Sequence, residues 1–211
     1  MEVVYILLGW LLGILSPGIV SYISNRYKKT ALQNIVIEEL RDVKKRLVFI
    51  PLKVYPAYGE LTEKHYLWIK EQTGNFTELV FDDEEKKKLN ELLKQNISIE
   101  NVVKLFNSNK ISENPAFHFK KLETSIIDAN QNNFDILDKQ FITKILEIKF
   151  QVRVFNEEVQ SASEFLKMTF DSSITEINHQ IIKEQIEMKN HTISEKAVLI
   201  VEKINQVIKS Y

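Results

Sequence analysis

Residues 141–166 read FITKILEIKFQVRVFNEEVQSASEFL, and this stretch decides the fold class. Apolar side chains recur in it every three or four residues, the spacing that places them on one face of an α-helix. Together with Phe134 they form a heptad seam, typical of a coiled coil or a bundle rod. The seam comprises Phe134, Phe141, Ile145, Ile148, Val152, Phe155, Val159, Ala162 and Leu166. Phenylalanines in such a seam favour packing against more than one partner helix.

The helix that carries the seam is expected to be long. Asn114-Pro115 places an N-cap residue before a proline at the first helical position, and neither Gly nor Pro follows in the chain. We therefore expect one helix from Pro115 to about Phe170, roughly 80 Å long. Asp138 then falls at a seam position, where one polar side chain can fix the register.

Shorter helices are expected on both sides of this rod. Apolar spacing predicts helices over 30–49, 60–72, 98–106 and 174–188, and a last one beginning at a Thr192/Glu195 capping box. A charge pattern of acids followed by lysines over 82–88 predicts another. Pro51 and Pro56 are expected to end the first of these helices, which makes 49–59 a connector, and Asn190-His191-Thr192 is expected to be a break. The sequence predicts no strand, so the fold class is all-α with a long helical hairpin.

The N-terminal stretch 3–23 differs from the rest because it holds no charged residue. As a helix it spans about 31 Å, close to the hydrocarbon thickness of a bilayer. The sequence therefore predicts a transmembrane helix over residues 1–24, a basic juxtamembrane helix and Pro-containing connector over 25–59, and a cytoplasmic helical domain over 60–211. The basic residues that follow the span predict its orientation in the bacterial plasma membrane. The N-terminus is expected outside the cell and residues 25–211 on the cytoplasmic side.

Two groups of residues in this region are candidate sites. A four-residue row, Gly9, Gly13, Pro17 and Ser21, allows close helix packing or lines a pore. Ser16-Pro17-Gly18 predicts a kink beside this row, so the candidate packing or pore residues are Gly9, Gly13, Ser16, Pro17, Gly18 and Ser21. A basic group is expected to contact anionic lipids, and it comprises Arg26, Lys28, Lys29, Lys44, Lys45 and Arg46. Membrane lipids and further copies of the chain are therefore the expected partners.

Composition and motifs argue against catalysis. The chain has no Cys, which excludes disulfides and thiolate metal sites, and no nucleotide, hydrolase or metalloprotease motif is present. Glu176 and His179 share a helix face, but a carboxylate-bridged metal pair needs two such motifs, so we expect no enzyme activity, no cofactor and no metal. Without Glu2, 28 bases face 28 acids. This balance argues against a broadly cationic nucleic-acid binder, although a nucleotide or nucleic-acid ligand at a local patch stays open.

The layout resembles that of small single-pass effectors of bacterial phage-defence systems, of which the Hailong-type channel effector is one. The resemblance rests on the span 3–23, the basic stop at Arg26, Lys28 and Lys29, and the heptads after Pro115. It implies a membrane-embedded oligomer that forms a pore gated through its cytoplasmic domain by a cytosolic ligand or partner. The alternative is a single-pass anchored scaffold that recruits a partner to the inner membrane.

Overall fold

The computed structural model describes residues 2–73, 98–108 and 117–211, apart from the side chains of residues 2–9, 11, 12, 14 and 15. The described residues form helices and contain no strand, which confirms the all-α class. The elements are α1 (Glu2–Tyr58), α2 (Glu63–Thr73), α4 (Ile99–Ser108), α5 (Ser125–Ala129), the 3₁₀ helix η1 (Gln131–Ile136), α6 (Lys139–Met168) and α7 (Glu176–Ser210).

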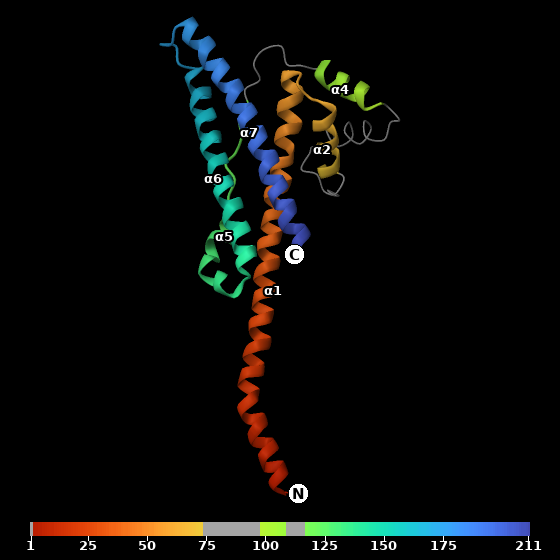
Figure 1. Ribbon diagram of the computed structural model, residues 1–211. Coiled ribbons are helices and arrows are strands. Elements are labelled where there is room, and N and C mark those ends of the chain that lie inside the picture. Colours follow the sequence, from red (N-terminus) through yellow and green to blue (C-terminus); the bar gives the residue numbers. More distant parts are fainter. Residues whose placement is uncertain (1, 74–97, 109–116) are drawn as a thin grey trace, which may run out of the picture.

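Three long helices build the core (Figure 1). Helices α6 and α7 form an antiparallel hairpin, and α7 also packs along the second half of α1. One apolar cluster joins all three helices, with Leu40, Leu47, Phe141, Phe155 and Ile200 among its fully buried members. The helical hairpin expected from the sequence is therefore present, and it folds onto α1 of the same chain.

The heptad seam is the inner face of this bundle. Its members from Phe134 to Ala162 are buried, and Leu166 near the end of α6 is half-buried. Since these side chains are buried within one chain, mainly against α7, the seam from Phe134 to Ala162 is not available to a second copy. The phenylalanines of the seam belong to the apolar cluster that includes residues of α1, α6 and α7.

The single helix expected from Pro115 to Phe170 is wrong. Residues 117–124 are not helical, α5 and η1 are short, and Leu137 is extended (ψ 162°). The run Asn130-Gln131-Asn132-Asn133 contains poor helix formers, which explains the interruption. Asp138 is the N-cap residue of α6 and not a seam residue, and its carboxylate pairs with Lys29 of α1 at 2.8 Å.

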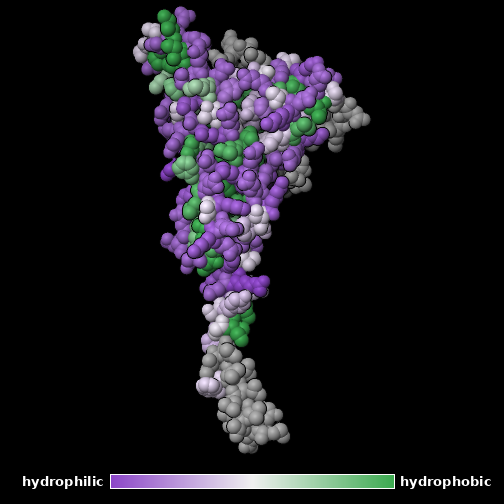
Figure 2. All heavy atoms as spheres, viewed as in Figure 1, coloured by the Kyte–Doolittle hydropathy of each residue, from purple (hydrophilic) through white to green (hydrophobic). Residues whose placement is uncertain are grey.

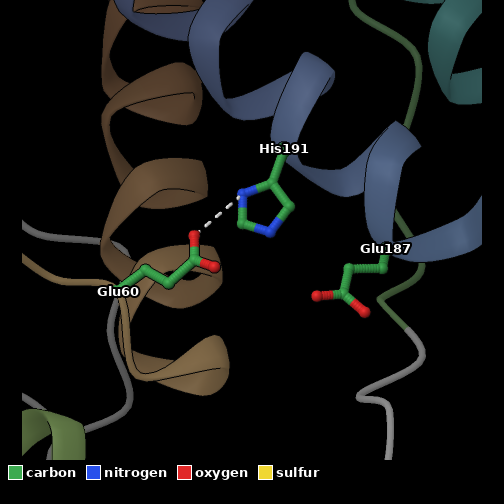
Figure 3. Close-up of side chains that lie close together, drawn as sticks. All are labelled: Glu60, Glu187 and His191. Carbon is green, nitrogen blue, oxygen red and sulfur yellow. Dashed lines mark ion pairs between the residues drawn. The ribbon is translucent and has the colours of Figure 1, made fainter. Parts of the chain in front are cut away.

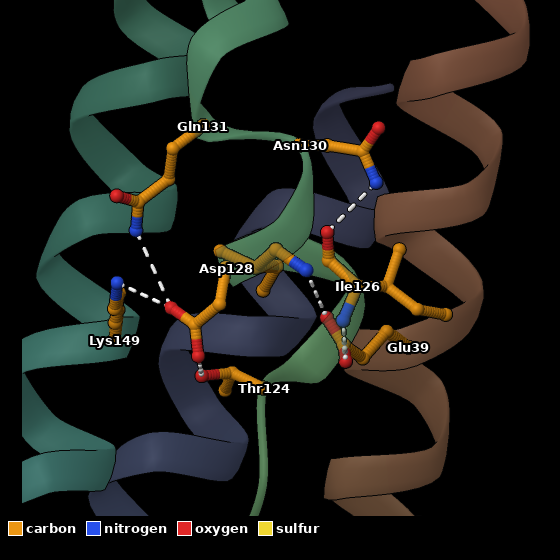
Figure 4. A network of polar contacts seen from close by, with 8 residues as sticks. Glu39, Thr124, Ile126, Asp128, Asn130, Gln131 and Lys149 are labelled. Carbon is orange, nitrogen blue, oxygen red and sulfur yellow. Dashed lines mark hydrogen bonds and ion pairs between the residues drawn. The ribbon is translucent and has the colours of Figure 1, made fainter.

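Helix α5 is held in place by a carboxylate from α1 (Figure 4). Glu39, which is only 9% exposed, accepts the backbone N–H groups of Ile126 and Ile127 at 2.7 and 2.8 Å. These N–H groups lie in the first turn of α5, where the helix itself offers them no acceptor. Asp128 continues the network by accepting from Thr124 and by pairing with Lys149 of α6.

The connector expected at 49–59 is wrong, because α1 continues through Pro51 and Pro56 to Tyr58. Each internal proline costs helix stability of about 3 kcal/mol. Burial of Val48, Val54 and Tyr58 against the bundle offsets this cost. The end of α1 instead falls at Gly59, whose positive φ of 73° suits glycine.

The break expected at Asn190-His191-Thr192 is also wrong, because α7 is one helix from Glu176 to Ser210. The Thr192 hydroxyl donates back to the Met188 carbonyl, so it does not cap a new helix. Asn190 is fully buried in the bundle. These polar residue types are typical of turns, but here they lie inside a continuous helix that is stabilised by tertiary contacts.

Two of the shorter predicted helices are confirmed. The helix expected over 60–72 corresponds to α2, and the helix expected after Ser98 corresponds to α4, with Ser98 Oγ accepting from the Asn101 N–H. The helix start at Asn114-Pro115 and the charged helix over 82–88 lie outside the described residues.

The first half of α1 projects away from the bundle (Figures 1 and 2). Side chains on several sides of it are exposed, including Ile19, Val20, Tyr22 and Ile23. Figure 2 shows hydrophobic side chains on this shaft directly below the largely hydrophilic bundle. Among the described residues, hydropathy and length together mark no helix as capable of crossing a bilayer.

Candidate functional site

A polar cluster forms where α1 ends against the middle of α7. The end of α1 is fixed by two backbone hydrogen bonds, Gly59 N–H to the Pro56 carbonyl at 3.0 Å and Glu60 N–H to the Tyr55 carbonyl at 2.8 Å. This pair of bonds is the Schellman arrangement, which closes a helix at a left-handed glycine. It sets Tyr58 and Glu60 against α7.

Tyr58 is the buried anchor of the cluster. Its hydroxyl accepts a hydrogen bond from Asn190 Nδ2 at 2.9 Å, and both residues are buried. Burial raises the pKa of Tyr58; the Asn190 hydrogen bond opposes this shift, and the nearby Glu187 and Glu60 carboxylates add to it. The Tyr58 ring also lies 4.8 Å from the His191 ring.

Two carboxylates and one imidazole converge at the edge of this cluster (Figure 3). Glu60 Oε2 lies 3.5 Å from His191 Nδ1, which makes an ion pair when the imidazole is protonated. Glu187 lies one helical turn before His191 on α7. One ligand-type atom from each of the three residues lies within 4.8 Å of the others.

A cavity of about 220 Å³ opens next to the cluster, between α1, α2 and α7. Its walls comprise Pro51, Tyr55, Lys64, His65, Trp68, Glu195, Val198 and Glu202. The rings of Tyr55 and His65 stack at 3.9 Å, so one wall is aromatic. Lysine and glutamates supply charges of both signs around this wall.

Two ring nitrogens in the cavity wall are buried without a hydrogen-bond partner, namely His65 Nδ1 and Trp68 Nε1. Burial lowers the pKa of His65, and Lys64 adds to this effect while Glu60 opposes it. A neutral imidazole has one donor and one acceptor nitrogen. Because these two atoms are buried, a ligand in the cavity would reach them only after a side-chain movement, whereas the aromatic and charged groups of the wall suit a small partly apolar ligand directly.

The structure separates the predicted basic group into two sets. Arg26 and Lys28 are exposed on the projecting half of α1, and Lys29 pairs with Asp138. Lys44 lies about 27 Å further along the helix than Arg26, and it is buried, which lowers its pKa. Lys44 is therefore unable to contact lipid headgroups, and the expectation for it is wrong. Its neighbours Lys45, which pairs with Asp42, and the exposed Arg46 lie at the same level of the bundle.

The predicted packing row lies in the projecting half of α1. Gly13 and Gly18 have no atom within 4 Å of the position that a Cβ would take. Ser16, Pro17 and Ser21 are exposed, and the surroundings of Gly9 lie outside the described residues. No other part of the described chain therefore packs at Gly13 or Gly18, which lie on different sides of the helix.

Sequence reasoning missed the Glu60–Glu187–His191 cluster. The available signal was Glu187-x-x-x-His191, a four-residue spacing that puts both side chains on one helix face. The expected turn at Asn190–Thr192 concealed it, since a broken helix would separate the pair. Glu60 gives no local signal, because only the fold brings it to α7. The Glu176/His179 pair, which the sequence analysis considered, lies at the start of α7 and is not part of the cluster.

Fold and site together define an all-helical bundle with one projecting helix. No protein-family model matches the chain, and no curated protein or solved structure is significantly similar to it. Function is therefore inferred from the chain's own residues.

Proposed function

We propose that the chain is a single-pass anchored helical module, with residues 3–23 in a bacterial inner membrane and the bundle in the cytoplasm. The observation that carries this proposal is the unbroken course of α1 from its exposed apolar half to Tyr58 at the polar cluster. A helix that is apolar on all sides suits lipid better than water. Arg26 and Lys28 follow the apolar stretch and remain exposed for anionic headgroups.

The bundle is the working part in this proposal. It binds a cytosolic ligand in the cavity beside Tyr55 and His65, or a protein partner on its surface, and it carries out no catalysis. The tip of the α6–α7 hairpin supports a partner-binding role, because Phe170 and Ile177 there are 82% and 76% exposed. The tip lies at the end of the molecule opposite to the projecting half of α1 (Figure 1), so it points away from the membrane.

A second candidate is an oligomeric pore, as the resemblance to phage-defence effectors implies. The open space at Gly13 and Gly18 favours it, since small residues allow helix backbones to approach closely in lipid. In this version several copies of residues 3–23 surround a pore, and binding to the bundle changes the gating equilibrium through α1. The anchored module needs no such assembly, because the seam is already covered within one chain.

The first experiment tests the anchor and separates these candidates. The full-length protein is expressed in bacteria, and its membrane fraction is washed with alkaline carbonate and then solubilised in detergent for mass measurement. The anchored module predicts protein that resists the wash and is monomeric in detergent. The pore predicts discrete oligomers that conduct ions in planar bilayers. Protein released by the wash would contradict both.

A matched pair of variants sharpens the choice. Gly9→Leu with Gly13→Leu blocks close packing, and Leu7→Val with Leu11→Val changes two residues at the same spacing on another face. The pore predicts that only the glycine variant loses its oligomers and conductance. The anchored module predicts the same mass for both variants and for the unchanged protein.

A further inference from the structure

The Glu60–Glu187–His191 cluster has an unusual charge balance. Two carboxylates approach each other, and among the described residues no Lys or Arg forms an ion pair with either of them. Like charges at this separation repel. A bound cation would remove the repulsion. Asn190, the residue before His191 on α7, is fully buried, and its Oδ1 atom has no hydrogen-bond partner among the described residues.

The three side chains are held by rigid elements. Glu187 and His191 are one turn apart on α7, and Glu60 directly follows the Schellman end of α1. The buried hydrogen bond between Asn190 and Tyr58 ties these two elements together at the same level. Binding therefore needs side-chain adjustment and no rearrangement of the backbone.

We propose that Glu60, Glu187 and His191 bind a divalent cation of the Zn²⁺ class. Imidazole nitrogen with carboxylate oxygen is a donor set that Zn²⁺ and its neighbouring transition metals accept, whereas Ca²⁺ and Mg²⁺ prefer oxygen alone. Two ligands of a tetrahedral Zn²⁺ lie about 3.4 Å apart, given bonds of about 2.0–2.1 Å. The Glu60–His191 separation of 3.5 Å is already close to this value. Three protein ligands leave one position for water or a ligand group.

Cation binding at this place would join the end of α1 to the middle of α7. Because α1 is the helix that projects from the bundle, the cation would fix the bundle relative to the projecting segment. The site makes no use of residues 3–23, so it stands or falls separately from the membrane proposal.

The test is titration of the full-length protein in detergent with Zn²⁺ alone, measured by calorimetry after chelator treatment. We expect one Zn²⁺ per chain with micromolar or tighter affinity, and a thermal unfolding midpoint that rises with Zn²⁺ concentration because only the folded state binds. Absence of binding in the unchanged protein would overturn the proposal.

Variants locate the binding. Glu187→Gln and Glu60→Gln keep the side-chain shapes and remove one ligand charge each, so each should weaken binding by roughly 10–100-fold or more. Glu60 is more than half exposed, so its replacement leaves the fold intact even if a change at His191 does not. The matched control is Glu176→Gln with His179→Gln, a Glu–His pair on the same helix outside the cluster. Equal loss in the control, or none in the two cluster variants, would overturn the assignment.

Discussion

The two halves of α1 obey different rules although they belong to one helix. From Leu32 to Tyr58 the helix buries one face, mainly against α7 and α2, and its exposed face carries charges such as Glu38 and Arg41. Before Leu32 the described side chains are exposed on several sides of the helix, and many of them are apolar. The two halves therefore share the same secondary structure. They differ in the surroundings that their surfaces suit.

This difference explains why the prolines have different roles. Pro51 and Pro56 lie in the half that is stabilised by core packing, and the helix continues through both. Pro17 is exposed in the projecting half, where its missing N–H leaves the Gly13 carbonyl without its helical hydrogen bond. If this half lies in a membrane as proposed, that carbonyl would need a partner from another helix, a nearby hydroxyl or water.

The largest expected effect comes from one substitution placed in each half. Leu47→Asp puts a charge into the core, where Leu47 is 0% exposed. Its cost of several kcal/mol is a large share of a total stability of roughly 5–15 kcal/mol, so the cooperative thermal transition should disappear. Ile19→Asp should leave that transition unchanged, because Ile19 is exposed.

The same pair tests the membrane assignment. A carboxylate at the centre of a span disfavours insertion by roughly 2.5–3.5 kcal/mol. Ile19 lies six residues beyond the centre of 3–23 and should carry part of this cost, so Ile19→Asp should shift part of the protein from floated vesicles to the soluble fraction. Circular dichroism and vesicle flotation measure the two outcomes. If Ile19→Asp melts like Leu47→Asp, or floats like the unchanged protein, the comparison between the halves fails.

An intermediate effect is expected at Glu39. Glu39→Gln leaves one backbone N–H of α5 facing an amide N–H₂ and no longer an oxygen, which should lower the free energy of unfolding by about 2 kcal/mol. Glu38→Gln on the exposed side of the same helix turn removes only a surface ion pair and should cost less than about 1 kcal/mol. Urea denaturation of both variants measures the difference. Equal costs would show that Glu39 does not hold α5.

The smallest expected effect is the pH dependence that His65 contributes. Its folded pKa is lowered by burial, so the unfolded chain binds the proton more readily, near pH 6.5. The contribution of His65 to the free energy of unfolding is therefore fully present above about pH 6.5. It is lost as the pH falls from this value towards the lower pKa of the folded state. His65→Phe should reduce the difference between urea midpoints at pH 7.5 and 5.5, whereas the exposed His118→Phe should not. An unchanged difference in His65→Phe would assign the pH dependence to other groups.

The sequence predicts the core better than it predicts the helix ends. The seam spacing identified the buried face of α6, because burial against neighbours imposes the 3.6-residue period directly. The position of a helix end depends both on local residue preferences and on packing against distant parts of the chain. Pro51, Pro56 and Asn190 are all helix-breaking signals, and in each case packing at that level of the bundle outweighs the local preference.

The candidate site was harder to predict for the same reason. Glu187 and His191 carry a local spacing signal, but Glu60 and Tyr58 reach them only through the fold. Lys44 shows the reverse error: its positive charge beside two other bases suggested a lipid contact, and the structure buries it. Neither residue type nor local charge predicts which side of a helix will pack against an element that is distant in sequence.

The contact from Glu39 to α5 has a consequence for the order of folding. The donors that start α5 are separated by 87 and 88 residues from the carboxylate that accepts them. A five-residue helix is too short to persist alone in water, so we expect α5 to form only once α1 has docked. The α6–α7 hairpin joins neighbours in sequence and is expected to close early, with the 125–138 segment ordering later on the surface that the long helices provide.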